Sequence, residues 1–150
     1  MNLGSVLQNH VLLTGLAGWI LAQMLKIPID YFRERRWNWA LFFAAGGMPS
    51  SHSALVTSTA AAIGLHYRFD NPMFGVAVAL AMIVVYDATG IRRQAGMQAQ
   101  KINVLVEELL QGHPISQEHL LEVLGHTPLE ALGGVLLGLV VALSLWFLWR

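Results

Sequence analysis

A short polar segment, "GGMPSSHSAL" at residues 46–55, carries the first residues that could do chemistry. It interrupts a run of alanine, leucine and phenylalanine and contains one titratable side chain, His52. Pro49 ends the preceding segment, and Ser50 or Ser51 can cap a helix that begins near His52. A capped helix start offers free backbone N–H groups and a positive dipole end, which predicts an anion site. A capped helix with an incidental histidine is an equally ordinary interpretation.

A second histidine, His126, occurs in "LGHTPLEAL", just before the last long apolar stretch. Thr127, Pro128 and Glu130 fit the N-cap, N1 and N3 positions of a helix, which makes a capping box. Glu130 therefore has a structural role that needs no catalysis. His126 lies outside the cap and could act as a general base, a nucleophile or a metal ligand.

Basic residues occur in two blocks that could bind an anion. In "LKIPIDYFRERRWNW", Lys26 and Arg33 are separated by six residues. In "YDATGIRRQAG", Arg92 and Arg93 follow Asp87. Arginines can form a fork for phosphate oxygens that an aspartate orients. The competing interpretations are cytoplasmic positive charge beside an aromatic belt for the first block, and a weak surface ion pair for the second.

A metal site is the alternative chemistry for the second histidine. His119, Glu122 and His126 recur at helical spacings, and Asp87 could add a carboxylate. Gly125 is expected to break the helix before His126, and no carboxylate cluster completes the site. We therefore predict that the chain binds no metal and no other cofactor.

The composition is that of a membrane protein. Hydrophobic residues make up 55% of the 150 residues and charged residues 12%, whereas about 25% are charged in a typical soluble domain. The apolar surface must therefore contact membrane lipids. The chain has no cysteine, which excludes disulfides and thiolate metal sites. The net charge is zero and no basic stripe is present, so we expect no nucleic-acid partner.

Four apolar segments are expected to cross the membrane and to position these residues. They are residues 6–25, 53–67, 72–90 and 129–149. Residues 37–47 are too short to cross and are expected to form a re-entrant or interfacial segment. The predicted fold is an all-α integral membrane protein with one domain over residues 1–150. It is a helical bundle of about four spans plus the re-entrant segment and short cytoplasmic amphipathic helices.

Positive charge predicts which ends of the spans face the cytoplasm. The two basic blocks follow the first and third spans, so both are cytoplasmic if the N-terminus is outside. Residues 91–128 then form a cytoplasmic segment with amphipathic helices in "AQKINVLVEELLQG" and "PISQEHLLEVLG", the first lying against the bundle or the membrane. Ionisable residues from four chain regions meet at this face: Lys26, Arg33, His52, Asp87, Arg92, Arg93, His126 and Glu130.

These motifs resemble those of the phosphatidic-acid phosphatase type 2 (PAP2) superfamily, which are K-x6-R-P, P-S-G-H and S-R-x5-H-x3-D. Lys26 and Arg33 reproduce the first spacing without its proline, and "PSSH" resembles the second pattern. His126 to Glu130 resembles the end of the third, with glutamate for aspartate, but the candidate arginines lie far upstream. Over nearly its full length the chain resembles the divergent PAP2 family, through "GGMPSSHSA", "YDATGIRRQAG" and "LGHTPLE".

The resemblance implies a PAP2-like bundle in a bacterial inner membrane and a phosphohydrolase that needs no metal. His126 would attack phosphorus to form a phosphohistidine, Glu130 would orient it, and His52 would protonate the leaving alkoxide. The substrate would be a lipid phosphate, such as phosphatidate or a polyprenyl phosphate. The residues expected at its phosphate are Lys26, Arg33, Ser50, Ser51, Asp87, and Arg92 or Arg93.

Two other functions stay open. One is a non-catalytic binder or carrier of phosphorylated lipid, which the altered third motif favours. The other is a metal-dependent lipid-headgroup enzyme that uses the histidine and carboxylate set described above. Because standard PAP2 members have more helices, a homodimer could complete the cavity. Gly133, Gly134 and Gly138 form a small-residue pattern suited to close packing within or between subunits.

Overall fold

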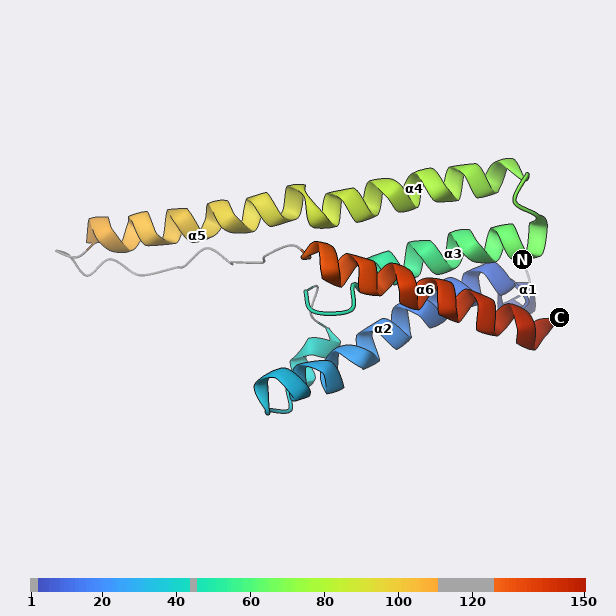
Figure 1. Cartoon of the computed structure of the whole chain (residues 1–150), viewed down its shortest axis with the longest axis horizontal. Helices are drawn as coiled ribbons and strands as arrows, with labels where there is room; N and C mark the ends of the chain where they lie inside the picture. The colour runs from blue at the N-terminus through green and yellow to red at the C-terminus, as the bar shows by residue number, and fades with distance from the viewer. Residues whose placement is uncertain (1–2, 44–45, 111–125) are drawn as a thin grey trace.

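The computed structural model describes residues 3–43, 46–110 and 126–150, and all regular elements in these ranges are helices (Figure 1). They are α1 (Leu3–Leu7), α2 (His10–Glu34), the 3-10 helix η1 (Trp39–Phe42), α3 (Ser51–Tyr67), α4 (Pro72–Thr89), α5 (Ile91–Leu110) and α6 (Pro128–Trp149). The described part of the chain is therefore all-α, as the sequence predicts.

Local capping signals set where the main helices begin. Asn9, Ser50, Asn71 and Thr127 are the N-caps of α2, α3, α4 and α6, and each side chain accepts a hydrogen bond from a backbone N–H of the first turn. These bonds satisfy donors that a helix start leaves unpaired, so a few consecutive residues suffice to define each start. The predicted cap at Ser50 and the predicted capping box at Thr127 are confirmed.

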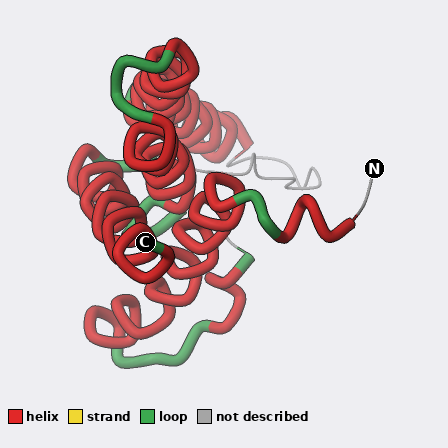
Figure 2. Tube along the Cα trace, turned by 90° about the vertical axis from the view of Figure 1, so that its right-hand side faces the viewer, coloured by secondary structure: helices red, strands yellow, loops and turns green. Residues whose placement is uncertain are grey.

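Helix α3 contacts α2, α4 and α6, and these helices pack around it (Figures 1 and 2). It runs antiparallel to α2 and α4 and parallel to α6 (Figure 1). The starts of α3 and α6 and the end of α4 consequently meet at one end of the bundle. Helix α1 and the end of α6 lie at the opposite end (Figure 1).

Glycines let α2 and α6 approach α3 closely. A Cβ atom at Gly134 of α6 would collide with the carbonyl oxygen of Ser50, and one at Gly138 would lie 2.7 Å from the carbonyl oxygen of Ala54. A Cβ atom at Gly18 of α2 would lie 3.1 Å from that same Ala54 oxygen. Small residues allow such close backbone approach between membrane helices. These glycines of the small-residue pattern thus pack within the chain. The homodimer stays a prediction, and this packing does not argue for it.

Among the residues that the structure describes, three helical stretches are long and apolar enough to cross a membrane: His10–Phe32, Pro72–Glu107 and Pro128–Trp149. Large apolar side chains on them are exposed, such as Met82 at 69% and Leu136 at 55%. Exposed apolar surface of this kind is what lipid contact requires. Helix α3 has 17 residues and falls short of these stretches, so its crossing stays a prediction.

Helix α2 extends beyond the predicted end of the first span. That span was expected to end at residue 25, but the helix continues through Pro28 to Glu34. An interior proline removes one backbone hydrogen bond, and the remaining bonds carry the helix past it. The helix ends at Arg35, which has a left-handed backbone (φ 57°) and donates its N–H to the carbonyl of Tyr31. Lys26 is therefore an interior helix residue and not part of a loop.

Helix α5 continues the line of α4 away from the bundle (Figure 1) and contacts no other described element. The predicted amphipathic helix is confirmed, but it does not pack against the described bundle. The second predicted cytoplasmic helix, residues 114–125, lies outside the described residues. Within residues 37–47 the structure has η1, which contacts α2. Its re-entrant placement stays a prediction.

Candidate functional site

His126 and Glu130 form a pair at the start of α6. Nδ1 of His126 lies 3.3 Å from Oε2 of Glu130, and His126 is only 4% exposed. The same Oε2 atom accepts a hydrogen bond of 2.9 Å from the backbone N–H of Thr127, which closes the capping box. Glu130 therefore caps the helix and contacts the imidazole at the same time. The capping role that the sequence indicates does not exclude a role beside His126.

His52, in the first turn of α3, is a neighbour of His126. The ring centroids are 6.5 Å apart and the ring planes are inclined by 58°. A backbone hydrogen bond of 2.9 Å from Ser50 N–H to the Glu130 carbonyl joins the start of α3 to the first turn of α6. This link between the two helix starts brings together histidines that are far apart in the sequence.

Lys26 contributes a buried cation from α2. Its side chain is 1% exposed and interacts electrostatically with the carboxylate of Glu130. Gly47 lies over its aliphatic part, because a Cβ atom at Gly47 would be 3.7 Å from Cδ of Lys26. Gly47 has φ 91°, a conformation that glycine adopts readily. The "GGMPSSHSAL" segment thus covers a charged group that, once buried, requires polar or anionic partners.

The start of α3 is a cluster of buried hydroxyl groups. Ser50 accepts hydrogen bonds from the backbone N–H of Ser53 at 3.3 Å and from its hydroxyl at 3.1 Å. Ser51 is fully buried, and its hydroxyl has no hydrogen-bond partner within the described ranges. Burying an unsatisfied hydroxyl has a free-energy cost, so Ser51 marks a place where a polar ligand could bind.

Gln23 is a candidate that the motifs do not include. It is 5% exposed, and its buried Oε1 atom has no hydrogen-bond partner among the residues that the structure describes. Gly18 lies at the level of Ala54, and Lys26 lies at the level of Gly47. The antiparallel register of α2 and α3 therefore places Gln23 near the start of α3. The sequence could have indicated Gln23 through its spacing, because it precedes Lys26 by three residues and therefore lies on the same face of the helix.

The other predicted residues come from segments at or beyond this end of the bundle. Asp87 is half-buried in the last turn of α4. Arg33 lies seven residues after Lys26, about 10 Å farther along the α2 axis. Arg92 and Arg93 lie in the first turn of α5. The side chains of these three arginines lie outside what the structure describes, so their phosphate contacts stay predictions.

The metal alternative has an incomplete ligand set in the described part of the chain. His119 and Glu122 lie outside it. In residues 3–43, 46–110 and 126–150, no group of three or more His, Cys, Asp or Glu side chains could hold a metal ion.

The arrangement combines groups with complementary chemistry. An ammonium group and a helix N-terminus both stabilise an anion. Two imidazoles, one of them held by a carboxylate, can transfer protons or attack an electrophile. Because α2, α3 and α6 each supply part of the site, it depends on the packing of the whole bundle.

Comparison with known proteins gives a family match over most of the chain. Residues 7–141 match the model of the divergent PAP2 family. The chain is 39% identical over 151 residues to a Bacillus subtilis (strain 168) protein named "Uncharacterized membrane protein YuiD", with 93% of this chain and 96% of the relative covered. No solved structure matches the chain. With its three stretches apolar enough to span a bilayer, the chain is a membrane protein and belongs to the divergent PAP2 family.

Proposed function

We propose that the chain is a lipid-phosphate phosphatase that hydrolyses a phosphomonoester through a phosphohistidine at His126. The observation that carries the proposal is the geometry of the two histidines. Glu130 lies 3.3 Å from Nδ1 of His126, and the His52 ring lies 6.5 Å from the His126 ring. Rings at this separation can contact one phosphate group, the first at phosphorus and the second at an ester oxygen.

The two histidines would divide the reaction between them. With its Nδ1 proton donated to Glu130, His126 has a lone pair on Nε2 that would bond to phosphorus while the bond from phosphorus to the lipid oxygen breaks. Protonated His52 would give its proton to the leaving alkoxide. In the second step neutral His52 would take a proton from water as the water oxygen attacks phosphorus. The N–P bond then breaks, inorganic phosphate leaves, and both histidines return to their starting states.

Positive charge near the histidines would stabilise the phosphoryl oxygens. Lys26 would contribute its buried ammonium group, and Ser51 with the start of α3 would add hydrogen-bond donors. Arg33 and one of Arg92 or Arg93 would add further charge. Phosphoryl transfer depends mainly on positioning and charge stabilisation. We place the site at the cytoplasmic face of a bacterial inner membrane, because the basic blocks favour that side.

Binding of a phosphorylated lipid without turnover is the second candidate, and the burial of His126 favours it. His126 is only 4% exposed, so little of its imidazole is accessible for attack on a substrate. A protein that keeps Lys26 and the start of α3 could hold the phosphate and leave it intact. Both candidates require binding of lipid phosphate, so hydrolysis separates them.

The test is phosphate release from phosphatidate or a polyprenyl phosphate by the purified full chain in lipid nanodiscs, with a metal chelator present. We expect release by the wild type and at least about hundredfold slower release by His126→Ala. His10→Ala is the matched control, because His10 stacks on Trp149 at 4.5 Å at the opposite end of the bundle. The control should release phosphate at the wild-type rate. Rapid quenching of the wild type should trap acid-labile phosphate on the protein.

Three outcomes would change the assignment. Release by His126→Ala at the wild-type rate would remove His126 as the nucleophile. Binding of phosphatidate without release by the wild type would select the non-catalytic binder. Metal in the purified protein, together with activity that the chelator abolishes, would select the metal-dependent headgroup enzyme.

A further inference from the structure

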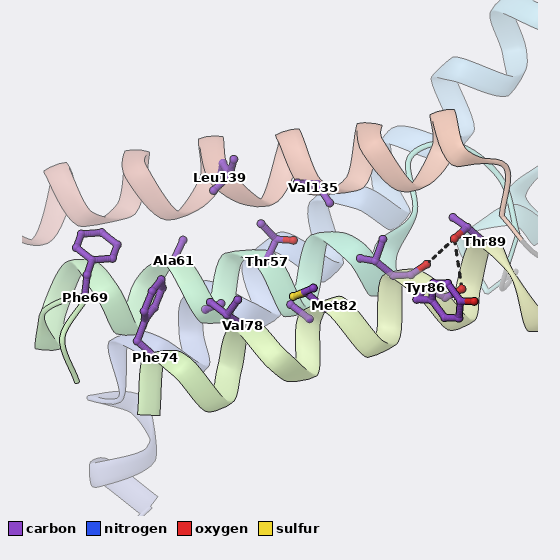
Figure 3. Close-up of a pocket in the computed structure, with 13 residues that line it drawn as sticks. Thr57, Ala61, Phe69, Phe74, Val78, Met82, Tyr86, Thr89, Val135 and Leu139 are labelled. Atoms are coloured by element: carbon purple, nitrogen blue, oxygen red, sulfur yellow. Dashed lines mark hydrogen bonds between the residues drawn. The ribbon is translucent and has the colours of Figure 1, made fainter. Parts of the chain in front are cut away.

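A largely apolar groove of about 600 Å³ runs between α3, α4 and α6 (Figure 3). Ala61 of α3, Val78 and Met82 of α4, and Val135 and Leu139 of α6 line it. The groove exists because α4 packs along α3 and approaches α6 at few points, which leaves space between α4 and α6. Its volume lies in the range of sites that bind small molecules.

The two ends of the groove differ in chemistry. At one end the rings of Phe69 and Phe74 pack edge to face, with centroids 5.1 Å apart and planes at 89° (Figure 3). At the other end lie Tyr86 and Thr89, in the last turn of α4 (Figure 3). Thr89 follows Phe74 by fifteen positions, which correspond to about 22 Å of helix. This length exceeds the half-thickness of a bilayer hydrocarbon core, about 15 Å.

The Thr89 end of the groove adjoins the candidate site. On α3 the lining begins at Thr57, five residues after His52, and on α6 it begins at Val135, five residues after Glu130. Five helical residues cover about 7 Å along the axis. Because α4 runs in the opposite direction to both helices, its C-terminal residue Thr89 lies at this same end. The groove and the site are therefore arranged end to end.

We propose, building on the proposed function, that the groove binds one hydrocarbon chain of the phosphorylated lipid. The phosphate lies at His52 and His126, and the far end of the chain lies at the Phe69–Phe74 pair. An apolar occupant is required because the lining is almost entirely hydrocarbon, and the Thr89 hydroxyl already donates to the carbonyl of Val85 at 2.9 Å. The substrate is then a lipid phosphate with a long chain whose whole length is held by protein.

Photocrosslinking tests this placement directly. The probe is hexadecyl phosphate with a diazirine at the end of its chain, added to the full-length protein in nanodiscs. We expect labelled peptides that contain Phe69 or Phe74. A second probe, with the diazirine next to the phosphate, should instead label peptides that contain Tyr86 or Thr89. The same diazirine on hexadecanol, which lacks the phosphate, should label the groove far less.

A pair of alanines on α4 supplies matched variants. Ala81 lines the groove, whereas Ala79 is exposed and does not line it. Ala81→Trp should reduce chain-end labelling about tenfold, because the indole side chain would occupy the space of the hydrocarbon chain. Ala79→Trp should label like the wild type. If Ala81→Trp fails to fold, Ala61→Leu on α3 fills the groove more gently and should give a smaller loss in the same direction.

The outcomes separate this inference from the proposed function. Equal labelling by the phosphate and alcohol probes, or equal labelling of the two alanine variants, would overturn the inference even where phosphate is released. Crosslinks to a second copy of the chain would overturn it too, because another protomer would then cover the groove. Phosphate-dependent labelling of the groove without phosphate release would uphold the inference for a binder and reject the phosphatase.

Discussion

Glu130 contacts His126 with the same carboxylate oxygen that caps helix α6. Oε2 lies 3.3 Å from Nδ1 of His126 and accepts the backbone N–H of Thr127 at 2.9 Å. Helix capping and orientation of an imidazole are thus two functions of one atom. A useful substitution has to keep one function and remove the other.

Glu130→Gln makes that separation. Glutamine also serves at the third helix position of a capping box, so the start of α6 should be retained. A neutral amide stabilises a charged imidazole much less than a carboxylate does, so phosphate release should fall by about a hundredfold. Release kinetics and the thermal unfolding midpoint are the measurements. Unchanged kinetics would leave Glu130 as a helix cap alone, and Glu130→Ala should lower stability by about 1 kcal/mol through loss of the cap.

Lys26→Met tests whether the buried ammonium group binds the ligand. Methionine has a similar length, but it leaves the carboxylate of Glu130 without this cation, and removing one partner of a buried charged pair is destabilising. We expect phosphatidate affinity to fall at least about tenfold, together with an unfolding midpoint below that of the wild type. Lys101→Met, at an exposed position on α5, is the control and should bind normally. Unchanged affinity with lower stability would make Lys26 a structural partner of Glu130.

Gly134→Ala tests the close approach of α6 to α3. The new methyl group would meet the carbonyl oxygen of Ser50, so the helices must separate. We expect a loss of about 1–3 kcal/mol in stability. Phosphatidate binding should also weaken, because the Ser50 N–H donates a hydrogen bond to the Glu130 carbonyl and a shift of Ser50 would disturb the site. Gly75→Ala on α4 has open space around it and should stabilise by up to about 1 kcal/mol. Equal midpoints for the two variants would contradict the close packing.

The predicted sidedness is accessible to cysteine labelling, because the chain has no cysteine of its own. Asp70 lies in the α3–α4 turn with its side chain 71% exposed, and Gln98 is exposed on α5. An impermeant maleimide should label Asp70→Cys in intact cells and Gln98→Cys only after permeabilisation. The opposite pattern would place the candidate site on the outer face.

Much of the fold is predictable from short stretches of sequence. Ser50 and the Thr127–Glu130 box mark helix starts because a cap needs only a side-chain oxygen and a backbone N–H two or three residues later. Composition predicts the membrane, since 12% charged residues cannot cover a soluble surface. The predicted first span covers only the charge-free residues 6–25, whereas α2 continues through Pro28 to Glu34, because an apolar window measures the hydrocarbon crossing and not the length of the helix.

The sequence by itself thus determined the membrane class, the helix starts, and which residue types could bind a phosphate. Only the tertiary structure decided that His52 lies beside His126, that Lys26 is buried, and that Gly134 and Gly138 of α6 pack against α3. The physical reason is the separation along the chain between the residues that interact. Capping and hydropathy depend on neighbouring residues or on composition, whereas these contacts join helices distant in the chain and follow from how closely side-chain shapes let those helices approach.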